Sequence, residues 1–256
     1  MNFAALDFTI IGPALAAGCL VLATHVLLGR EVLRRGIIFI DLAVAQMAAI
    51  GVIGASTMGF EAHGLAAQLA AFAAALLGGI VLSWTDARFG QSQEALIGVS
   101  FVLAATGSIL LLANNPRGGE ELQDILVGQI LWVNFRGLGP AAIATVLVLA
   151  AWPFVTRRFG RVGFYLLFAV SVTVSVQLVG IYLVFASLIV PALAIRNYGA
   201  RALPAGYVIG ILGYITGLMI SAVFDLPTGA VIVWTLAVTA LAGRALLLRS
   251  RSAAIA

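Results

Sequence analysis

Long apolar runs separated by short polar breaks fill this chain from end to end. A bilayer core about 30 Å thick takes roughly 20 helical residues, so runs of this length predict membrane-spanning helices. The sequence therefore predicts an all-α fold, a polytopic transmembrane helical bundle. Cutting the chain at its polar breaks gives nine expected spans, at residues 8–28, 37–57, 65–84, 95–113, 138–155, 162–178, 179–196, 202–222 and 229–248.

Residues 162–195 form the longest run without a formal charge, and they are too long for a single crossing. We divide them into two helices at Gly180, because a residue without a Cβ lets the backbone bend. Pro191, further along, lacks the N–H that a continuous helix needs. Gln177 lies beside the bend, where its amide either lines a translocation path or bonds a neighbouring helix. Gln177, Gly180 and Pro191 are thus the predicted hinge and path residues.

The arginines indicate how the bundle is oriented. All 14 basic residues are arginine, and 12 of them fall in the inner connections if the N-terminus lies outside. Because basic residues are retained on the cytoplasmic side, the distribution predicts an N-out, C-in topology. The 12 arginines are Arg30, Arg34, Arg35, Arg88, Arg157, Arg158, Arg161, Arg196, Arg201, Arg244, Arg249 and Arg251.

One outer connection, residues 114–137, is longer than the others. It begins with the turn-rich sequence NNPRGGEE and continues with an apolar stretch that is too short to cross. We expect this stretch to form a short helix that caps the outer face and returns to the same side. Trp132 suits the membrane interface, where tryptophan is enriched.

Composition excludes several classes of protein. The chain is 62% apolar and 9% charged, with a mean hydropathy of +1.14, which no soluble domain of this size carries. No polar block is long enough for a second domain, so residues 1–256 are expected to be a single transmembrane domain. The sequence pI near 9.8 reflects the orienting arginines and does not indicate nucleic-acid binding.

Sequence motifs argue against an enzyme. A chain without lysine cannot contain the nucleotide-binding motif GxxxxGK[ST], and it also lacks HExxH, GxSxG and CxxC. Any ATP hydrolysis must come from a separate subunit. The sequence thus shows no standard hydrolytic or redox site, and we expect no permanently bound cofactor.

Asp41 is the most informative ionisable residue within a span. A carboxylate in hydrocarbon costs about 2.5–3.5 kcal/mol on insertion scales, so Asp41 should face the interior of the bundle. His25 lies at a similar depth in the preceding, antiparallel helix, and Gln46 follows on the same helix as Asp41. The three suit transient binding of a divalent cation or a proton relay. The alternatives are a structural His25–Asp41 hydrogen bond, or an Asp41 that reaches the inner interface.

Four stretches resemble the permease subunits of metal-ion ABC importers for zinc, manganese or iron(II). The resemblance implies a permease, that is a transport subunit, which forms a homodimer in the bacterial inner (plasma) membrane and is embedded in lipid. Its partners would be an ABC ATPase subunit and a periplasmic or extracellular metal-binding protein. The transported divalent metal ion is then the cargo. The family's S-x-x-x-D-x-P-x-G outer turn is matched by Ser221, Asp225, Pro227 and Gly229. The four stretches are residues 30–52, 94–113, 178–194 and 221–233.

The chain departs from that family in two places. Members carry Asp-x-x-x-His in the second span, whereas here the position of the His is Ala45, with Gln46 beside it. The oxygen ligands of Asp41 and Gln46 favour a hard ion such as Mn²⁺ over Zn²⁺. Members also carry an acidic coupling helix, which TRRFGR at residues 156–161 replaces. Coupling to an ATPase then involves the basic residues of this turn and of the following inner turn, residues 195–203, or it involves the loop at 85–94. The alternative is an ATPase-independent metal channel or secondary carrier. The expected coupling residues are Arg157, Arg158, Arg161, Arg196 and Arg201.

Overall fold

The computed structural model describes residues 8–62, 64–116, 118–198 and 202–253. These residues form helices and turns, with no strand among them, which confirms the predicted all-α class. The α-helices are α1 (Phe8–Arg35), α2 (Ile40–Thr57), α3 (Leu65–Phe89), α4 (Gln93–Leu112), α5 (Gly118–Val127), α6 (Leu138–Val179), α7 (Ile181–Ala194), α8 (Leu203–Phe224) and α9 (Thr228–Ala253). Three short 3₁₀ turns are η2 (Gly90–Ser92), η3 (Ile130–Trp132) and η4 (Arg196–Tyr198).

Six helical stretches within the described residues are long and apolar enough to cross a membrane. The shorter α7 is also apolar. These helices establish a polytopic membrane protein, while the count of nine spans and the N-out, C-in orientation stay predictions. The six stretches are Phe8–Arg35, Ile40–Thr57, Leu65–Leu112, Leu138–Val179, Leu203–Phe224 and Thr228–Leu247.

α1 continues beyond the predicted end of its apolar run at residue 28. Its last turns are held by Glu31, which pairs with Arg34 and Arg35 at 2.7 Å each, three and four residues further on. Such pairs stabilise a helix where it leaves the apolar layer. The hydrophobic run therefore underestimates the length of this helix.

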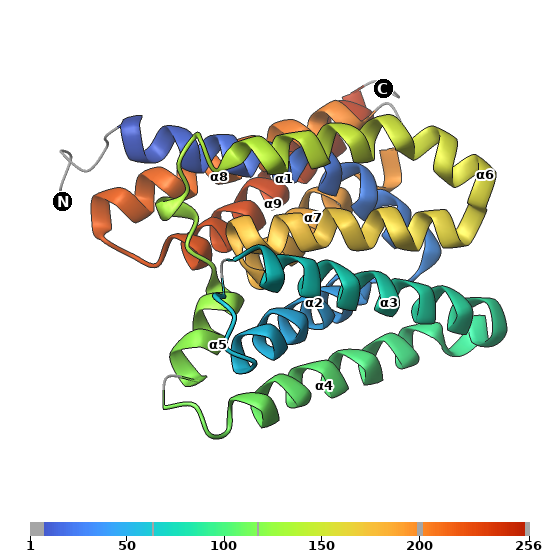
Figure 1. The fold of residues 1–256 in the computed structure, drawn as a ribbon. Coiled ribbons are helices and arrows are strands. Elements are labelled where there is room, and N and C mark those ends of the chain that lie inside the picture. Colours follow the sequence, from blue (N-terminus) through green and yellow to red (C-terminus); the bar gives the residue numbers. More distant parts are fainter. Residues whose placement is uncertain (1–7, 63, 117, 199–201, 254–256) are drawn as a thin grey trace.

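α6 turns back on itself at Gly160. This residue has φ 53° and ψ −117°, a conformation with positive φ that glycine adopts without strain and that matches the first central position of a type II′ turn. Figure 1 shows the two parts of α6, residues 138–159 and 161–179, lying antiparallel and joined at the bend. Gly160 is thus the one residue of TRRFGR with non-helical backbone angles, and the chain reverses there.

The junction of α6 and α7 falls at Gly180, where the sequence predicted the helix break. Gly180 has φ 81°, and the residue that follows α5, Gly128, has φ 72°. The two backbones lie against each other, because a Cβ on Gly128 would collide with Val179 and one on Gly180 would collide with Gly128. The 114–137 segment does contain a short helix, α5, but it begins within the turn-rich GGEE and ends at Val127, partway through the apolar stretch that was expected to form it. The end of α5 is held against the α6–α7 junction.

The remaining helices pack in two groups. α2 packs chiefly on α3 and α4, whereas α1 packs chiefly on α6, α7 and α8, and α9 packs on α8 and α7. α6 and α7 contact both α1 and α2. The main apolar core runs through all of these contacts, from Val26 of α1 to Val44 of α2 and Leu183 of α7. Figure 1 shows α4 on the outside of the α2–α3 group.

Candidate functional site

Asp41 lies in the first turn of α2 and is 1% exposed. Neither of its carboxylate oxygens has a hydrogen-bond partner among the described residues. The positive end of the α2 dipole offsets part of the cost of burying this group. The remainder requires a proton or a bound cation as counter-charge, because an isolated buried carboxylate is strongly unfavourable. Its burial also excludes the alternative in which Asp41 extends to the inner interface.

His25 is fully buried in α1, and one of its ring nitrogens lacks a partner. Nδ1 lies 3.0 Å from the Val21 carbonyl oxygen and 3.0 Å from Thr24 Oγ1, whereas Nε2 has no partner in the described part of the chain. A carbonyl can only accept, so in the neutral ring Nδ1 carries the proton and Nε2 keeps its lone pair. That tautomer has the form of a metal-binding imidazole.

Gln46 is 3% exposed, and its Oε1 has no hydrogen-bond partner among the described residues. It follows Asp41 by five residues, so the two side chains leave α2 about 140° apart and about 7.5 Å apart along its axis. Residues four apart share a helix face, but residues five apart do not. The side chains of Asp41 and Gln46 therefore lie on different faces of α2.

The structure does not join these three side chains in one ligand set. His25 and Asp41 form no hydrogen bond or ion pair with each other, so the expected structural pairing is not formed. α6 and α7 contact both α1 and α2, which otherwise pack on different partners. No group of three or more His, Cys, Asp or Glu side chains lies close enough to hold a metal ion within the described residues. Asp41 is the only acidic member of the predicted set.

The predicted hinge and path residues divide into buried and exposed positions. Gly180 and Pro191 are buried, the latter within α7. Gln177 is exposed near the end of α6 and makes no hydrogen bond to another described residue. The expectation that Gln177 bonds a neighbouring helix is thus not met within this single chain.

Three of the predicted coupling arginines, Arg157, Arg158 and Arg161, flank the Gly160 bend, where Figure 1 shows α6 turning back. Arg157 and Arg158 are exposed, and Arg158 lies 5.7 Å from the centre of the Phe159 ring. Arg161 Nε is 2.9 Å from Asp86 Oδ2, which ties the bend to α3. Arg196 is exposed in η4, and Arg201 lies outside the described residues. Arg157, Arg158 and Arg196 are thus the exposed members of the set that form no ion pair with another described residue.

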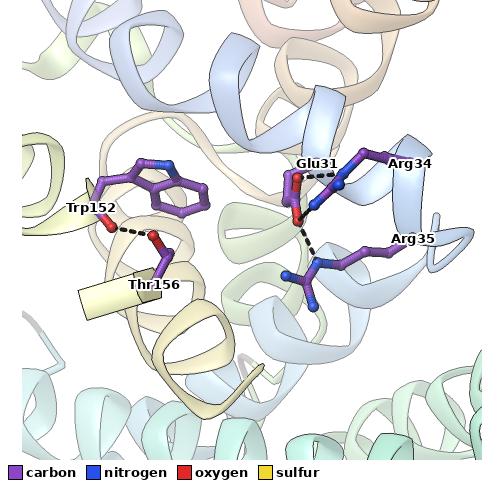
Figure 2. Close-up of polar contacts among 5 residues, drawn as sticks. All are labelled: Glu31, Arg34, Arg35, Trp152 and Thr156. Atoms are coloured by element: carbon purple, nitrogen blue, oxygen red, sulfur yellow. Dashed lines mark hydrogen bonds and ion pairs between the residues drawn. The ribbon is translucent and has the colours of Figure 1, made fainter. Parts of the chain in front are cut away.

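The sequence did not predict a cavity that lies near the arginines at the end of α1. It has a volume of about 500 Å³ and is lined by α1, α6, α7 and η4. Figure 2 shows Glu31 held by Arg34 and Arg35, with Trp152 of α6 on the other side. Thr156 Oγ1 donates to the Trp152 carbonyl oxygen at 2.5 Å. The spacing of Arg30 and Arg34, four residues apart on one face of α1, was the only local signal for this site.

Comparison with known proteins places these features in a family. The sequence matches the ABC 3 transport family over residues 7–164 and 156–246. This chain belongs to the ABC 3 transport family. The expected resemblance to metal-transport permeases is thereby confirmed, and so is the interpretation as a transport subunit of the bacterial inner membrane rather than an enzyme.

Two curated relatives of this ABC 3 family member carry names that refer to metals. A Chlamydia trachomatis protein named "Probable metal transport system membrane protein" is 23% identical over 184 residues, 63% of this chain and 63% of the relative. The chain thus spans less than two thirds of that relative's length. The "Manganese transport system membrane protein MntC" of Halalkalibacterium halodurans is 24% identical over 252 residues, covering 89% of this chain and 84% of the relative.

A solved structure shares the fold. A chain of the structure described as PsaBC from Streptococcus pneumoniae in complex with Fab superposes with a TM-score of 0.71 at 22% identity. The match covers 93% of this chain and 91% of that chain. The likeness extends over nearly the whole bundle, so no major part of this chain departs from the shared architecture.

Proposed function

We propose that this ABC 3 family member is the membrane-spanning permease subunit of an ATP-binding-cassette importer for divalent metal ions. A separate ATPase and a solute-binding protein would complete the transporter. The observation that carries the proposal is Asp41, a buried carboxylate in a membrane helix that has no hydrogen-bond partner among the described residues. Such a group is costly unless a cation or proton neutralises it, and ionisable residues inside membranes mark ion pathways. The names of the two metal-transport relatives support the same cargo class.

Within this proposal, manganese is favoured over zinc. Asp41 offers carboxylate oxygens, and the position four residues further on is Ala45, which supplies no ligand. Oxygen ligands suit Mn²⁺, whereas Zn²⁺ prefers imidazole or thiolate. Gln46 would offer a second oxygen ligand further along α2. His25 on α1 would offer a nitrogen ligand, its Nε2, which has no partner among the described residues. The ion would pass these groups in sequence rather than rest in one multidentate site.

The same proposal includes an N-out, C-in topology with nine crossings and a homodimer. Each part of α6 would cross separately, which places the Gly160 bend and its arginines in the cytoplasm. Exposed Gln177, on an apolar helix beside Gly180, supports a second copy or a water-filled path at that surface, since lipid cannot satisfy an amide. Buried Gly180 and Pro191 would let α7 tilt as the path opens to each side.

One observation favours the second candidate function, an ATPase-independent metal channel or secondary carrier. The Gly160 turn contains one non-helical residue, and residues 156–161 otherwise continue α6, so no separate coupling helix projects from it. In the importer, exposed Arg157 and Arg158 would have to make the ATPase contact directly.

Uptake of radioactive Mn²⁺ and Zn²⁺ tests the proposal in cells that express this chain with or without the neighbouring ATPase and binding protein. We expect ATPase-dependent uptake, with Mn²⁺ preferred, that Asp41→Asn abolishes at normal protein abundance. Asp124→Asn is the matched control, because this carboxylate is exposed on α5. Uptake by the chain alone would select the channel or carrier. Equal uptake by Asp41→Asn and wild type would remove Asp41 from the path.

A further inference from the structure

The cavity of about 500 Å³ at the arginine-rich end has several basic side chains in its wall, whereas most of the bundle is apolar. Three arginines line it, Arg30 and Arg34 from α1 and Arg196 from η4. Arg30 and Arg196 form no ion pair with any described residue, so their charges are not neutralised by the fold. Their position points to an anionic ligand in this cavity.

Glu31 also lines the cavity, yet it does not cancel this charge. Its carboxylate accepts from Arg34 Nε at 2.9 Å, from an Arg34 terminal nitrogen at 2.7 Å and from Arg35 Nε at 2.7 Å. Figure 2 shows both arginines converging on this one carboxylate. Glu31 thus fixes the orientation of Arg34, because a forked pair of hydrogen bonds restrains a planar guanidinium.

The rest of the wall suits a ligand that has an apolar part. Leu27 and Leu33 of α1 and Ala192 of α7 contribute apolar surface, and half-buried Trp152 closes the side on α6. Tryptophan at the end of a membrane helix marks the interface with the headgroup layer. Basic pockets between membrane helices bind the headgroups of anionic lipids there.

We propose that this cavity binds the phosphate of an anionic phospholipid. Guanidinium groups match phosphate oxygens in pairs, and the leucines accept the first part of the acyl chains. A soluble phosphate presents the same oxyanion and is the other source of this chemistry. The arginines repel a divalent cation, so the cavity is separate from the cargo path and the inference does not depend on which metal is carried.

Native mass spectrometry of the purified chain in a neutral detergent tests this site. Phosphatidylglycerol, phosphatidylcholine and inorganic phosphate are titrated separately onto wild type and onto the double variant Arg30→Ala/Arg196→Ala. We expect phosphatidylglycerol to bind wild type more tightly than phosphatidylcholine, and the double variant to bind it about tenfold more weakly, since two charged donors are lost. Arg88→Ala is the matched control, an exposed arginine on α3 outside the cavity, and should bind as wild type does.

Two further comparisons test whether the bound phosphate belongs to a lipid and whether the variants are folded. Displacement of phosphatidylglycerol by inorganic phosphate supports the site, whereas phosphate binding without any lipid binding overturns the lipid assignment. Equal lipid binding by wild type and the double variant also overturns the lipid assignment. The same holds if the double variant loses its association with the ATPase while its lipid binding is unchanged. Arg30→Gln/Arg196→Gln, which keeps polar side chains of similar reach, must show the same lipid loss at an unchanged unfolding temperature.

Discussion

At the scale of single residues, Gly160 carries the sharpest structural requirement. Its φ of 53° with ψ of −117° lies in a region that residues with a Cβ avoid, although open space surrounds the position. Gly160→Ala should therefore lower the free energy of unfolding by about 1–3 kcal/mol through backbone strain alone. A reduced thermal unfolding temperature of the detergent-solubilised chain would show it.

Gly98→Ala is the control for this change. Gly98 lies within α4 in helical conformation, also with no atom near the added Cβ. Alanine there should stabilise by about 0.5–1 kcal/mol, because it lowers the entropy of the unfolded chain. Equal effects of the two substitutions would show that the bend does not need its left-handed residue.

Asp41 shows what could be predicted from the sequence at this scale and what could not. An ionisable residue within an apolar run must be shielded from lipid, so its burial follows from the sequence alone. The exposure of Gln177 does not follow, because a helix that is apolar on every side gives no periodic signal for which face packs inward. The lack of a hydrogen bond between His25 and Asp41 likewise does not follow from the sequence, because it depends on α1 and α2 packing chiefly on different helices.

At the scale of elements, the contact of Gly128 with Gly180 determines how α5 is held. A Cβ on Gly128 would collide with the backbone of Val179 and Gly180, and its φ of 72° adds strain. Gly128→Ala should detach the end of α5, and amide hydrogen exchange in α5 should rise about tenfold or more. Gly119→Ala, at an open position of α5, should leave exchange unchanged. Unchanged exchange in both variants would contradict the contact.

The bend of α6 at Gly160 can be tested in the same way. Reversing the charge of exposed Arg157 and Arg158 to glutamate should weaken co-purification of the neighbouring ATPase by about tenfold, if these residues dock it. Arg161 stays unchanged, because its pair with Asp86 holds the bend. Arg136→Glu is the control, because Arg136 is an exposed arginine that precedes α6 and belongs to none of the candidate coupling segments. Full ATPase recovery with the double reversal would place the docking surface elsewhere.

Most helices could be predicted from the sequence because each coincides with an apolar run of membrane length. The break at Gly180 was also predictable, since a long uncharged run must be divided and glycine permits the division. The cavity could not be predicted. Arg30, Trp152 and Arg196 are far apart along the chain and meet only once α1, α6 and α7 have packed.

At the scale of the whole molecule, the orientation can be tested by labelling single cysteines. Glu61→Cys and Arg88→Cys are introduced in turn after Cys19→Ser removes the native thiol, and both positions are exposed. With N-out topology, a membrane-impermeant maleimide should label position 61 in intact cells and position 88 only after permeabilisation. The reverse pattern would invert the bundle and place the arginine-rich cavity outside.

The bend at Gly160 also limits how the bundle can move. Consecutive Cα atoms are about 3.8 Å apart across a trans peptide, so a one-residue connection leaves the two parts of α6 no slack to slide past each other. A displacement of the bend therefore moves both parts of α6, and the ion pair of Arg161 with Asp86 extends that movement to α3. We expect the movement to reach the other end of α6 as well, where Gly180 lies against Gly128 at the end of α5.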